Sequence, residues 1–497
     1  MGRISKQLQQ RHILLLLIIL GLSLFLRTYQ IVDRLGFDHD GDLFSWIVKD
    51  IVIDKHLRLI GQLTSADGIF IGPLFYYMLI PFFLLFRMDP IGGVVPITAI
   101  GVLTTLSYYI VFSQLWNRKA GLIGAFFHAV LLSSVYFDQR VVPSTLTNLW
   151  TIWYFYTLIN IARGNFRPLW LLGILTGLIW HIHIALFPAL VAVPFALLVA
   201  KKRPDKKAVV LFVIILILTS LPLLAFEVRH DFSQTQSLIQ NFKTPHNVES
   251  PGISKLNHVI LKVTGNVVRL FFYPQNPPFN HKLLLVALLL SPVLLNTKKL
   301  LSFKEVSVFY VWIFGVMMFF SFSSSILSEY YFANIEVIFL ASCSLTLLFL
   351  LNSSRVGKYL VLGLLGIILV KNMVFLVTYE IYQKGYSERK AIANYITSDS
   401  KTKGYPCVSV SYITPPGENV GFRYFFWLNK LHVNQPSSGA PVYTIVHPIE
   451  LAPENITFRS GQIGVILPER MPPEESLKKS CSGENANLTD SMFGFTR

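Results

Sequence analysis

Cysteine and charged residues are both scarce in this chain of 497 residues. Its three cysteines are Cys343, within an apolar run, and Cys407 and Cys481, within a polar C-terminal tail. They match no zinc-binding spacing and are too few for a disulfide framework. A single disulfide between Cys407 and Cys481 is one option that the sequence allows. Charged residues make up 14% of the chain, which is too little to keep a protein of this length dispersed in water.

Nucleotide signatures are missing as well. The sequence contains no GxxxxGK[ST], no GxGxxG after a strand and no paired HxxxH metalloprotease motif, so a nucleotide-activated substrate has no support. Lys and Arg number 43 against 27 Asp and Glu, an excess that also occurs in nucleic-acid-binding proteins. Here the basic residues come in short bursts between apolar runs of spanning length, so we expect no nucleic acid partner.

Apolar residues dominate what is present. The chain is 53% hydrophobic with a mean hydropathy of +0.53, which is typical of an α-helical polytopic membrane protein with the lipid bilayer as its surroundings. The first run is long for a signal peptide and no small-residue cleavage site follows it, so we expect a retained helix. Eleven candidate spans lie at residues 13–31, 92–115, 121–137, 145–162, 169–180, 184–200, 208–226, 283–295, 306–320, 331–351 and 359–377.

A further apolar run at 72–88 decides the topology. If it does not cross the membrane, six basic segments, including 201–207 and 298–304, share one side with the N-terminus. The positive-inside rule then makes the N-terminus cytoplasmic and the tail extracytoplasmic. We therefore place 72–88 along the outer interface, where its tyrosines suit the headgroup boundary. A twelfth span remains the alternative.

Two of the spans look too short for a bilayer core of about 30 Å, which needs about 20 helical residues. They are 169–180 and 184–200, joined by His181-Ile182-His183. Polar groups at that depth are tolerated only where protein or a water-filled cavity surrounds them. We expect one of the two histidines to face such a cavity, in a ligand-binding or acid-base role, with hydrogen-bonded packing as the alternative.

The remaining outer segments give the domain organisation. Residues 1–380 form a transmembrane module with a first outer loop at 32–91, which carries juxtamembrane helices, and a long outer loop at 227–282. Residues 381–497 form a small α/β domain, because strand-like runs at 407–413, 442–446 and 463–467 alternate with helix-like runs at 388–397 and 419–431.

Carboxylates gather in the first outer loop. Six of them are candidates for chemistry, since mutual repulsion favours either a bound cation or a raised pKa on one of the group. A solvated acidic loop whose Asp residues cap helices is the alternative. The six are Asp38, Asp40, Asp42, Asp50, Asp54 and Asp67.

Other polar residues converge on the same outer side. Glu227, Arg229 and His230 stand within one helical turn at the end of a span, Arg140 lies in the short loop at 138–144, and Glu329 precedes Tyr330 in the loop at 323–330. Arginine binds phosphate through two parallel hydrogen bonds, so this convergence favours an anionic ligand.

The order of several short motifs resembles the GT-C membrane glycosyltransferases, in particular the branch of protein O-mannosyltransferases and aminoarabinose transferases. The resemblance covers about residues 1–380. Its motifs are Asp40 with Lys49-Asp50-Ile51, then Ile71-Gly72-Pro73-Leu74-Phe75-Tyr76-Tyr77, Asn117-Arg118-Lys119-Ala120-Gly121-Leu122, Gln139-Arg140 with Pro143, the His183 region, and Phe226-Glu227-Val228-Arg229-His230-Asp231-Phe232.

This resemblance implies a GT-C fold in a bacterial plasma membrane and a polyprenyl-phosphate-linked sugar as donor, with a glycan, lipid or protein acceptor. By this resemblance Asp40 would be the catalytic base. The sequence has Asp-Gly-Asp in place of the commoner Asp-Glu pair, so whether Asp42 or Asp38 shares the catalytic role is an open question. A second acidic position has only weak candidates, Asp67 and Asp138.

We hypothesise an inverting transfer of a hexose or pentose to a hydroxyl. Arg140, Arg229, His230 and His183 would bind the donor phosphate, and a divalent metal on Asp40, Asp42 and His183 remains an option. A transporter or flippase for an anionic or lipid-linked substrate is the alternative function, although the chain has no internal repeat.

Overall fold

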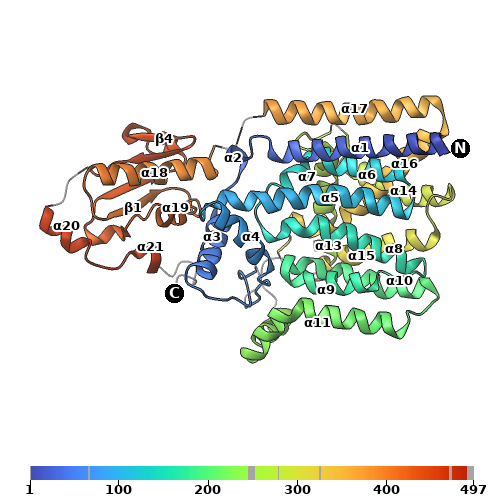
Figure 1. Ribbon diagram of the computed structural model, residues 1–497, viewed down its shortest axis with the longest axis horizontal. Helices are drawn as coiled ribbons and strands as arrows, with labels where there is room; N and C mark the ends of the chain where they lie inside the picture. The colour runs from blue at the N-terminus through green and yellow to red at the C-terminus, as the bar shows by residue number, and fades with distance from the viewer. Residues whose placement is uncertain are drawn as a thin grey trace.

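The computed structural model describes residues 2–64, 68–243, 252–277, 279–323, 326–379, 381, 383–469 and 473–489. Asp67 lies outside these residues. A bundle of long helices runs along the long axis of the molecule, and a small α/β domain sits at one end of it, opposite the N-terminus (Figure 1). Short helices of the first outer loop, α2 (Ile31–Arg34), α3 (His39–Val52) and α4 (Leu74–Leu85), lie between the two parts.

The predicted spans are helices, which confirms a helical membrane protein. By length and composition, six described stretches can cross a membrane: Gln10–Thr28, Pro90–Leu115, Lys206–Arg229, Phe303–Phe322, Glu329–Ser353 and Arg355–Thr378. The bundle consists of α1 (Gly2–Thr28), η1 (Pro90–Gly93), α5 (Val94–Leu115), α6 (Arg118–Val130), α7 (Leu132–Phe137), η2 (Pro143–Leu146), α8 (Thr147–Ala162), α9 (Leu169–Ile182), η3 (Ile184–Val191), α10 (Ala192–Ala200), α11 (Lys206–Arg229), α14 (His281–Thr297), α15 (Phe303–Phe322), η4 (Glu329–Ile335), α16 (Glu336–Ser353) and α17 (Arg355–Thr378).

Basic turns meet at the end of the bundle that lies away from the α/β domain. Arg163, after α8, donates to Glu305 at the start of α15 over 2.5 Å and to the carbonyl of Leu115 over 3.0 Å. Lys119, at the start of α6, donates to Asn352 at the end of α16 over 3.0 Å. Turns that the charge rule assigned to one side of the membrane therefore contact one another.

Helix α4 has both ends at the opposite end of the bundle, beside the α/β domain. Just before it, the amide of Gly72 donates to Trp180 at the end of α9 over 2.7 Å. Just after it, the carbonyl of Met88 accepts a hydrogen bond of 2.8 Å from Tyr424 of the α/β domain. Its 12 residues span only about 18 Å. Its place along the outer interface of the membrane stays a prediction.

The run 121–137, predicted as one span, is broken into α6 and α7 at Leu131, which is extended. The break leaves carbonyl groups of the last turn of α6 without helical partners, and side chains bind them. Arg27 donates to the carbonyls of His128 and Ala129, and Asn372 donates to that of Val130.

The described residues of the outer segment 227–282, which was predicted as a loop, include the helices α12 (Ser233–Lys243) and α13 (Ile253–Phe272). The amide before α13, of Gly252, donates to Ser321 at the end of α15, and Leu270 near its other end accepts from Ser133 of α7. One face of α13 packs into the main hydrophobic core through Val259, Val263, Val267 and Leu270. Its regular mixture of polar residues kept it below the hydropathy of a span.

The C-terminal domain is α/β, as predicted. Its sheet has the order β2-β1-β3-β5-β4, with β1 parallel to β2 and β3, and β5 antiparallel to β3 and β4. The disulfide between Cys407 and Cys481 is present. The helix expected at 419–431 is shorter, and two brief strands were not predicted. The elements are α18 (Tyr386–Thr402), β1 (Val408–Ile413), α19 (Arg423–Leu428), β2 (Val433–Asn434), η5 (Pro436–Ser438), β3 (Val442–Val446), η6 (Ile449–Leu451), η7 (Pro453–Asn455), β4 (Phe458–Ser460), β5 (Ile463–Ile466), α20 (Glu474–Ser480) and α21 (Ala486–Thr489).

Candidate functional site

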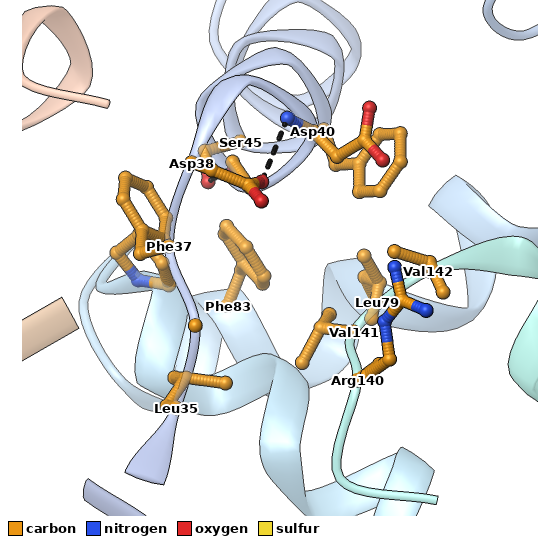
Figure 2. A pocket seen from close by; sticks show the side chains of 14 residues that line it. Leu35, Phe37, Asp38, Asp40, Ser45, Leu79, Phe83, Arg140, Val141 and Val142 are labelled. Atoms are coloured by element: carbon orange, nitrogen blue, oxygen red, sulfur yellow. Dashed lines mark hydrogen bonds between the residues drawn. The ribbon is translucent and has the colours of Figure 1, made fainter. Parts of the chain in front are cut away.

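The acidic cluster forms the N-terminus of α3. Asp38 caps the helix, because its carboxylate accepts a hydrogen bond of 3.1 Å from the amide of Asp40. Asp38 and Asp40 both line a cavity of about 80 Å³, whose floor is formed by Leu79 and Phe83 of α4. Figure 2 shows Arg140 on the facing wall, with its guanidinium group turned toward the acidic residues. The first catalytic candidates therefore face a cation across a small cavity.

Burial is the main cause of a raised pKa at Asp40, and the negative charge of Asp38 raises it further. The positive charges of His39 and Arg140 act in the opposite direction. A carboxylate that is half-buried and holds its proton more tightly than a free Asp accepts a proton from a substrate hydroxyl more readily. The site therefore suits a general base.

Arg140 also lines a second cavity, of about 160 Å³, on the bundle side of the first. Glu329 stands in this second cavity and forms ion pairs with Arg269 and Lys262 of α13, the latter over 3.7 Å. Asn266 donates to the carbonyl of Glu329 over 2.7 Å. The other polar residues that line this cavity are Ser133, Ser134, Asn148, Tyr330 and Glu336.

Arg269 and its neighbours on α13 were missed by the sequence analysis, which treated this segment as a loop. The signal was present in the spacing. Lys262, Asn266 and Arg269 recur at intervals of four and three residues on one helical face, while Val259, Val263, Val267 and Leu270 lie on the buried face. That period predicts an amphipathic helix with a cationic face.

His183 lines neither of the two cavities, but it contacts Tyr330, which lines the second one. Its ring contacts those of Tyr330 and Tyr331, with centroids 5.1 and 5.4 Å apart, and its Nδ1 accepts a bond from the amide of Ala185. His181 is buried instead, with its Nε2 3.0 Å from the carbonyl oxygen of Thr219. His181 therefore has a packing role, and a ligand-binding or acid-base role for His183 stays a prediction.

Glu227, Arg229 and His230 are not brought to this site. They lie at the end of α11, on the edge of the bundle (Figure 1), and line neither of the two cavities. Glu227 caps α12 by accepting hydrogen bonds from the amides of Gln234 and Thr235. The ring of His230 stacks on that of Phe226. The segment therefore lies apart from Asp40 and Arg140, and its phosphate-binding role stays a prediction.

Asp42 and Asp50 do not line the cavities either. Asp42 is fully buried against α19, where its Oδ1 accepts a hydrogen bond of 3.0 Å from the amide of Tyr424. Burial raises the pKa of Asp42 to about 7. Asp50 is paired with Arg58 over 2.6 Å. The geometry therefore separates Asp40 from two carboxylates of the same loop.

The metal-ligand set proposed from the sequence is not assembled. Within the described residues, no group of three or more His, Cys, Asp or Glu side chains could hold a metal ion. Asp40, Asp42 and His183 diverge, since Asp42 faces the C-terminal domain and His183 packs between two tyrosines.

Comparison with known proteins identifies the architecture. No protein-family model and no curated protein matches the sequence. Among solved structures, ArnT from Cupriavidus metallidurans bound to undecaprenyl phosphate has a TM-score of 0.53 at 13% identity, covering 92% of this chain and 99% of that one. The apo form of ArnT has a TM-score of 0.56 at 13% identity, covering 93% of this chain and 98% of that one. The apo oligosaccharyltransferase of Archaeoglobus fulgidus gives 0.52 at 13% identity, covering 96% and 78%. The chain therefore has the GT-C fold of these membrane glycosyltransferases, as the resemblance implied.

Proposed function

We propose that this protein is an integral membrane glycosyltransferase that moves a sugar from a polyprenyl-phosphate donor to an acceptor hydroxyl on the extracytoplasmic side. The observation that carries the proposal is the position of Arg140, which lines both the cavity with Asp40 and the cavity with Arg269. A carboxylate base and a set of cations for an anionic leaving group thus lie on either side of one guanidinium group. Undecaprenyl phosphate in the ArnT structure supports the class of donor.

The reaction divides between the two cavities. The acceptor hydroxyl in the first cavity gives its proton to Asp40 while its oxygen attacks the anomeric carbon. The bond from that carbon to the phosphate oxygen breaks, and the phosphate leaves with the electron pair through an oxocarbenium-like transition state. Arg140 and Arg269 stabilise the charge that develops on the phosphate, since both are in place before the reaction. A single displacement inverts the anomeric centre.

The proposed orientation puts the C-terminal domain outside the cytoplasm. Disulfides persist in oxidising compartments, and the bond between Cys407 and Cys481 ties β1 to the end of α20. The basic turns around Arg163 and Lys119 lie at the other end of the bundle, which the positive-inside rule assigns to the cytoplasm. A bacterial plasma membrane, with its undecaprenyl phosphate, is the proposed location.

The test is reconstitution of the purified protein in liposomes with a panel of polyprenyl-phosphate hexoses and pentoses. Sugar transfer or donor hydrolysis is expected for the wild type, and loss of most of it for Asp40→Asn. The matched control is Asp54→Asn, because Asp54 is in the same loop but is exposed and pairs with Lys49 away from both cavities. Equal turnover of Asp40→Asn and wild type would refute the assignment of the base. Movement of intact donor across the bilayer without turnover would indicate a flippase instead.

A further inference from the structure

The residues just before the acidic cluster belong to the hydrophobic core of the C-terminal domain. Leu35 and Phe37 are buried in the same cluster as Tyr386 and Phe425, more than 340 residues later in the chain. The ring of Phe37 lies 4.7 Å from that of Phe425 and 6.2 Å from that of Tyr386, measured between centroids. The amide of Tyr386 donates to the carbonyl of Leu35 over 2.9 Å. Asp40 follows only three residues after Phe37.

The residue two positions after Asp40 is held by the same domain. Asp42 accepts a hydrogen bond of 3.0 Å from the backbone amide of Tyr424, at the start of α19. The ring of Tyr424 packs edge-on against Trp46 of α3, 5.7 Å between centroids. Asp40 is therefore flanked on both sides, at Phe37 and at Asp42, by residues that the C-terminal domain fixes in place.

The segment after α4, which also lines the cavity at Pro90, is attached to the domain as well. Asp89, which precedes the cavity-lining Pro90, accepts a hydrogen bond of 2.5 Å from the hydroxyl of Tyr386 and pairs with Lys390 of α18. The hydroxyl of Tyr424 donates to the carbonyl of Met88 over 2.8 Å. One domain thus contacts both α3, which carries Asp40, and the segment that follows α4.

We infer that the C-terminal domain is a positioning element of the active site, which sets the location of Asp40 through Phe37, Asp42 and Asp89. The inference rests on the proposed function. A domain that only docked an acceptor would have no need to bury Phe37 and Leu35 in its own core. A carboxylate misplaced by about 1 Å loses on the order of 100-fold in rate, so the attachment has a direct kinetic consequence.

The central experiment compares Asp42→Ala, which removes the acceptor for the Tyr424 amide, with Asp42→Asn, which keeps an oxygen in that position. For Asp42→Ala we expect kcat to fall by about 10- to 100-fold, with the KM for a polyprenyl-phosphate sugar within about twofold of wild type. Asp42→Asn should recover most of the loss. The control is Glu474→Ala, which removes an exposed ion pair with Lys478 on α20.

Two further measurements separate positioning from stability. The acidic limb of the pH dependence of kcat should move to lower pH in Asp42→Ala, because a displaced Asp40 is less buried and its pKa falls toward the ordinary value. Phe37→Leu should shift the acidic limb in the same direction, because it weakens the packing of the chain on the N-terminal side of Asp40. A lower melting temperature with unchanged kcat and unchanged pH dependence in both variants would overturn the inference.

Failure of the proposed function is recognised separately. If the wild type neither transfers sugar nor hydrolyses any donor, the proposed function is refuted. Hydrogen exchange then tests only whether the C-terminal domain holds the segment around Asp40 in place. Amides of residues 38–45 should exchange faster in Asp42→Ala than in the wild type and at the wild-type rate in Glu474→Ala. Unchanged exchange in Asp42→Ala would refute the attachment whatever the activity.

Discussion

Arg27 and Asp138 form an ion pair that is closed off from solvent, with Nη2 and Oδ2 2.6 Å apart and side chains that are 0% and 1% exposed. Arg27 stands at the end of α1, and Asp138 follows α7. Gln139 adds hydrogen bonds to the carbonyls of Leu26 and Arg27. The ion pair and these hydrogen bonds therefore hold the end of α1 against the turn that carries Arg140.

Removal of one partner of this pair should be costly, because it leaves a buried charge without compensation. We expect Arg27→Ala to lower the free energy of unfolding by about 3–5 kcal/mol, measured by thermal unfolding in detergent. The double variant Arg27→Ala with Asp138→Asn should regain part of that loss, since no buried charge remains. A melting temperature of Arg27→Ala equal to that of the wild type would contradict the role given to the pair.

Asp38 should control the pH at which the enzyme becomes active. Its negative charge is one cause of the raised pKa of Asp40, and a base works only when it is deprotonated. In Asp38→Asn, which keeps a side chain that caps α3, the acidic limb of kcat/KM should therefore move to lower pH. The profile is measured from pH 4 to 8, with Asp54→Asn as the control. A limb that stays in place or moves upward would refute the electrostatic coupling.

Asp42 should make the protein less stable as the pH rises. Its pKa is raised by burial to about 7 in the folded protein, above the ordinary value of about 3.9. Such a group favours the folded state below the unfolded pKa, and this contribution is lost as the pH rises through 7. The melting temperature of the wild type should thus fall between pH 5 and pH 8 by more than that of Asp42→Asn. An equal fall in both proteins would show that Asp42 stays charged.

Arg140 and Arg269 should both affect donor binding and turnover, with the larger effect on turnover at Arg140. We expect Arg140→Gln to lower kcat by about 100-fold and to raise the KM for donor, because Arg140 lines both cavities. Arg269→Gln should raise KM with a smaller change in kcat. Arg459→Gln, at an exposed position within β4, is the control. Equal effects of all three variants would point to a general loss of charge rather than to this site.

The side of the membrane can be tested by labelling. With Cys343 replaced by Ser, a cysteine at Lys119 should resist a membrane-impermeant thiol reagent in intact cells, and a cysteine at Arg459 should react. Lys119 stands at the start of α6 and Arg459 in β4, two positions that the topology assigns to opposite sides. Labelling at position 119 in intact cells would mean that the run at 72–88 crosses and that the orientation is wrong.

Long apolar runs were predictable because a bilayer accepts few alternatives to an apolar helix. Three of the five described strands of the C-terminal domain, β1, β3 and β5, were predictable for a similar reason, since β-branched residues alternate along them. Helix α13 was not predicted because Lys262, Asn266 and Arg269 lower its mean hydropathy, although these three residues lie on one face of the helix. Sequence patterns report burial well when burial is in lipid, and less well when a helix lies at an interface.

The choice between Asp40 and Asp42 shows a second limit. Asp40 and Asp42 are two positions apart in a helix, which corresponds to about 200° of rotation. One of the pair therefore faces the cavity and the other faces away. Charge and composition are the same for both, and only the partner surface decides. That surface is Tyr424, which no local pattern links to α3. Distant contacts of this kind are where single-sequence inference ends.

The burial of Leu35 and Phe37 in the core of the C-terminal domain also has a consequence for biosynthesis. The ribosome makes Asp40 early, but the strands that complete the core around Phe37, up to β5 (Ile463–Ile466), come last. A nascent chain that is already inserted in the membrane would therefore carry its base without the surface that holds it. Turnover would begin only when translation is complete and the tail has been exported, so a premature stop before β5 should yield an inserted but inactive protein.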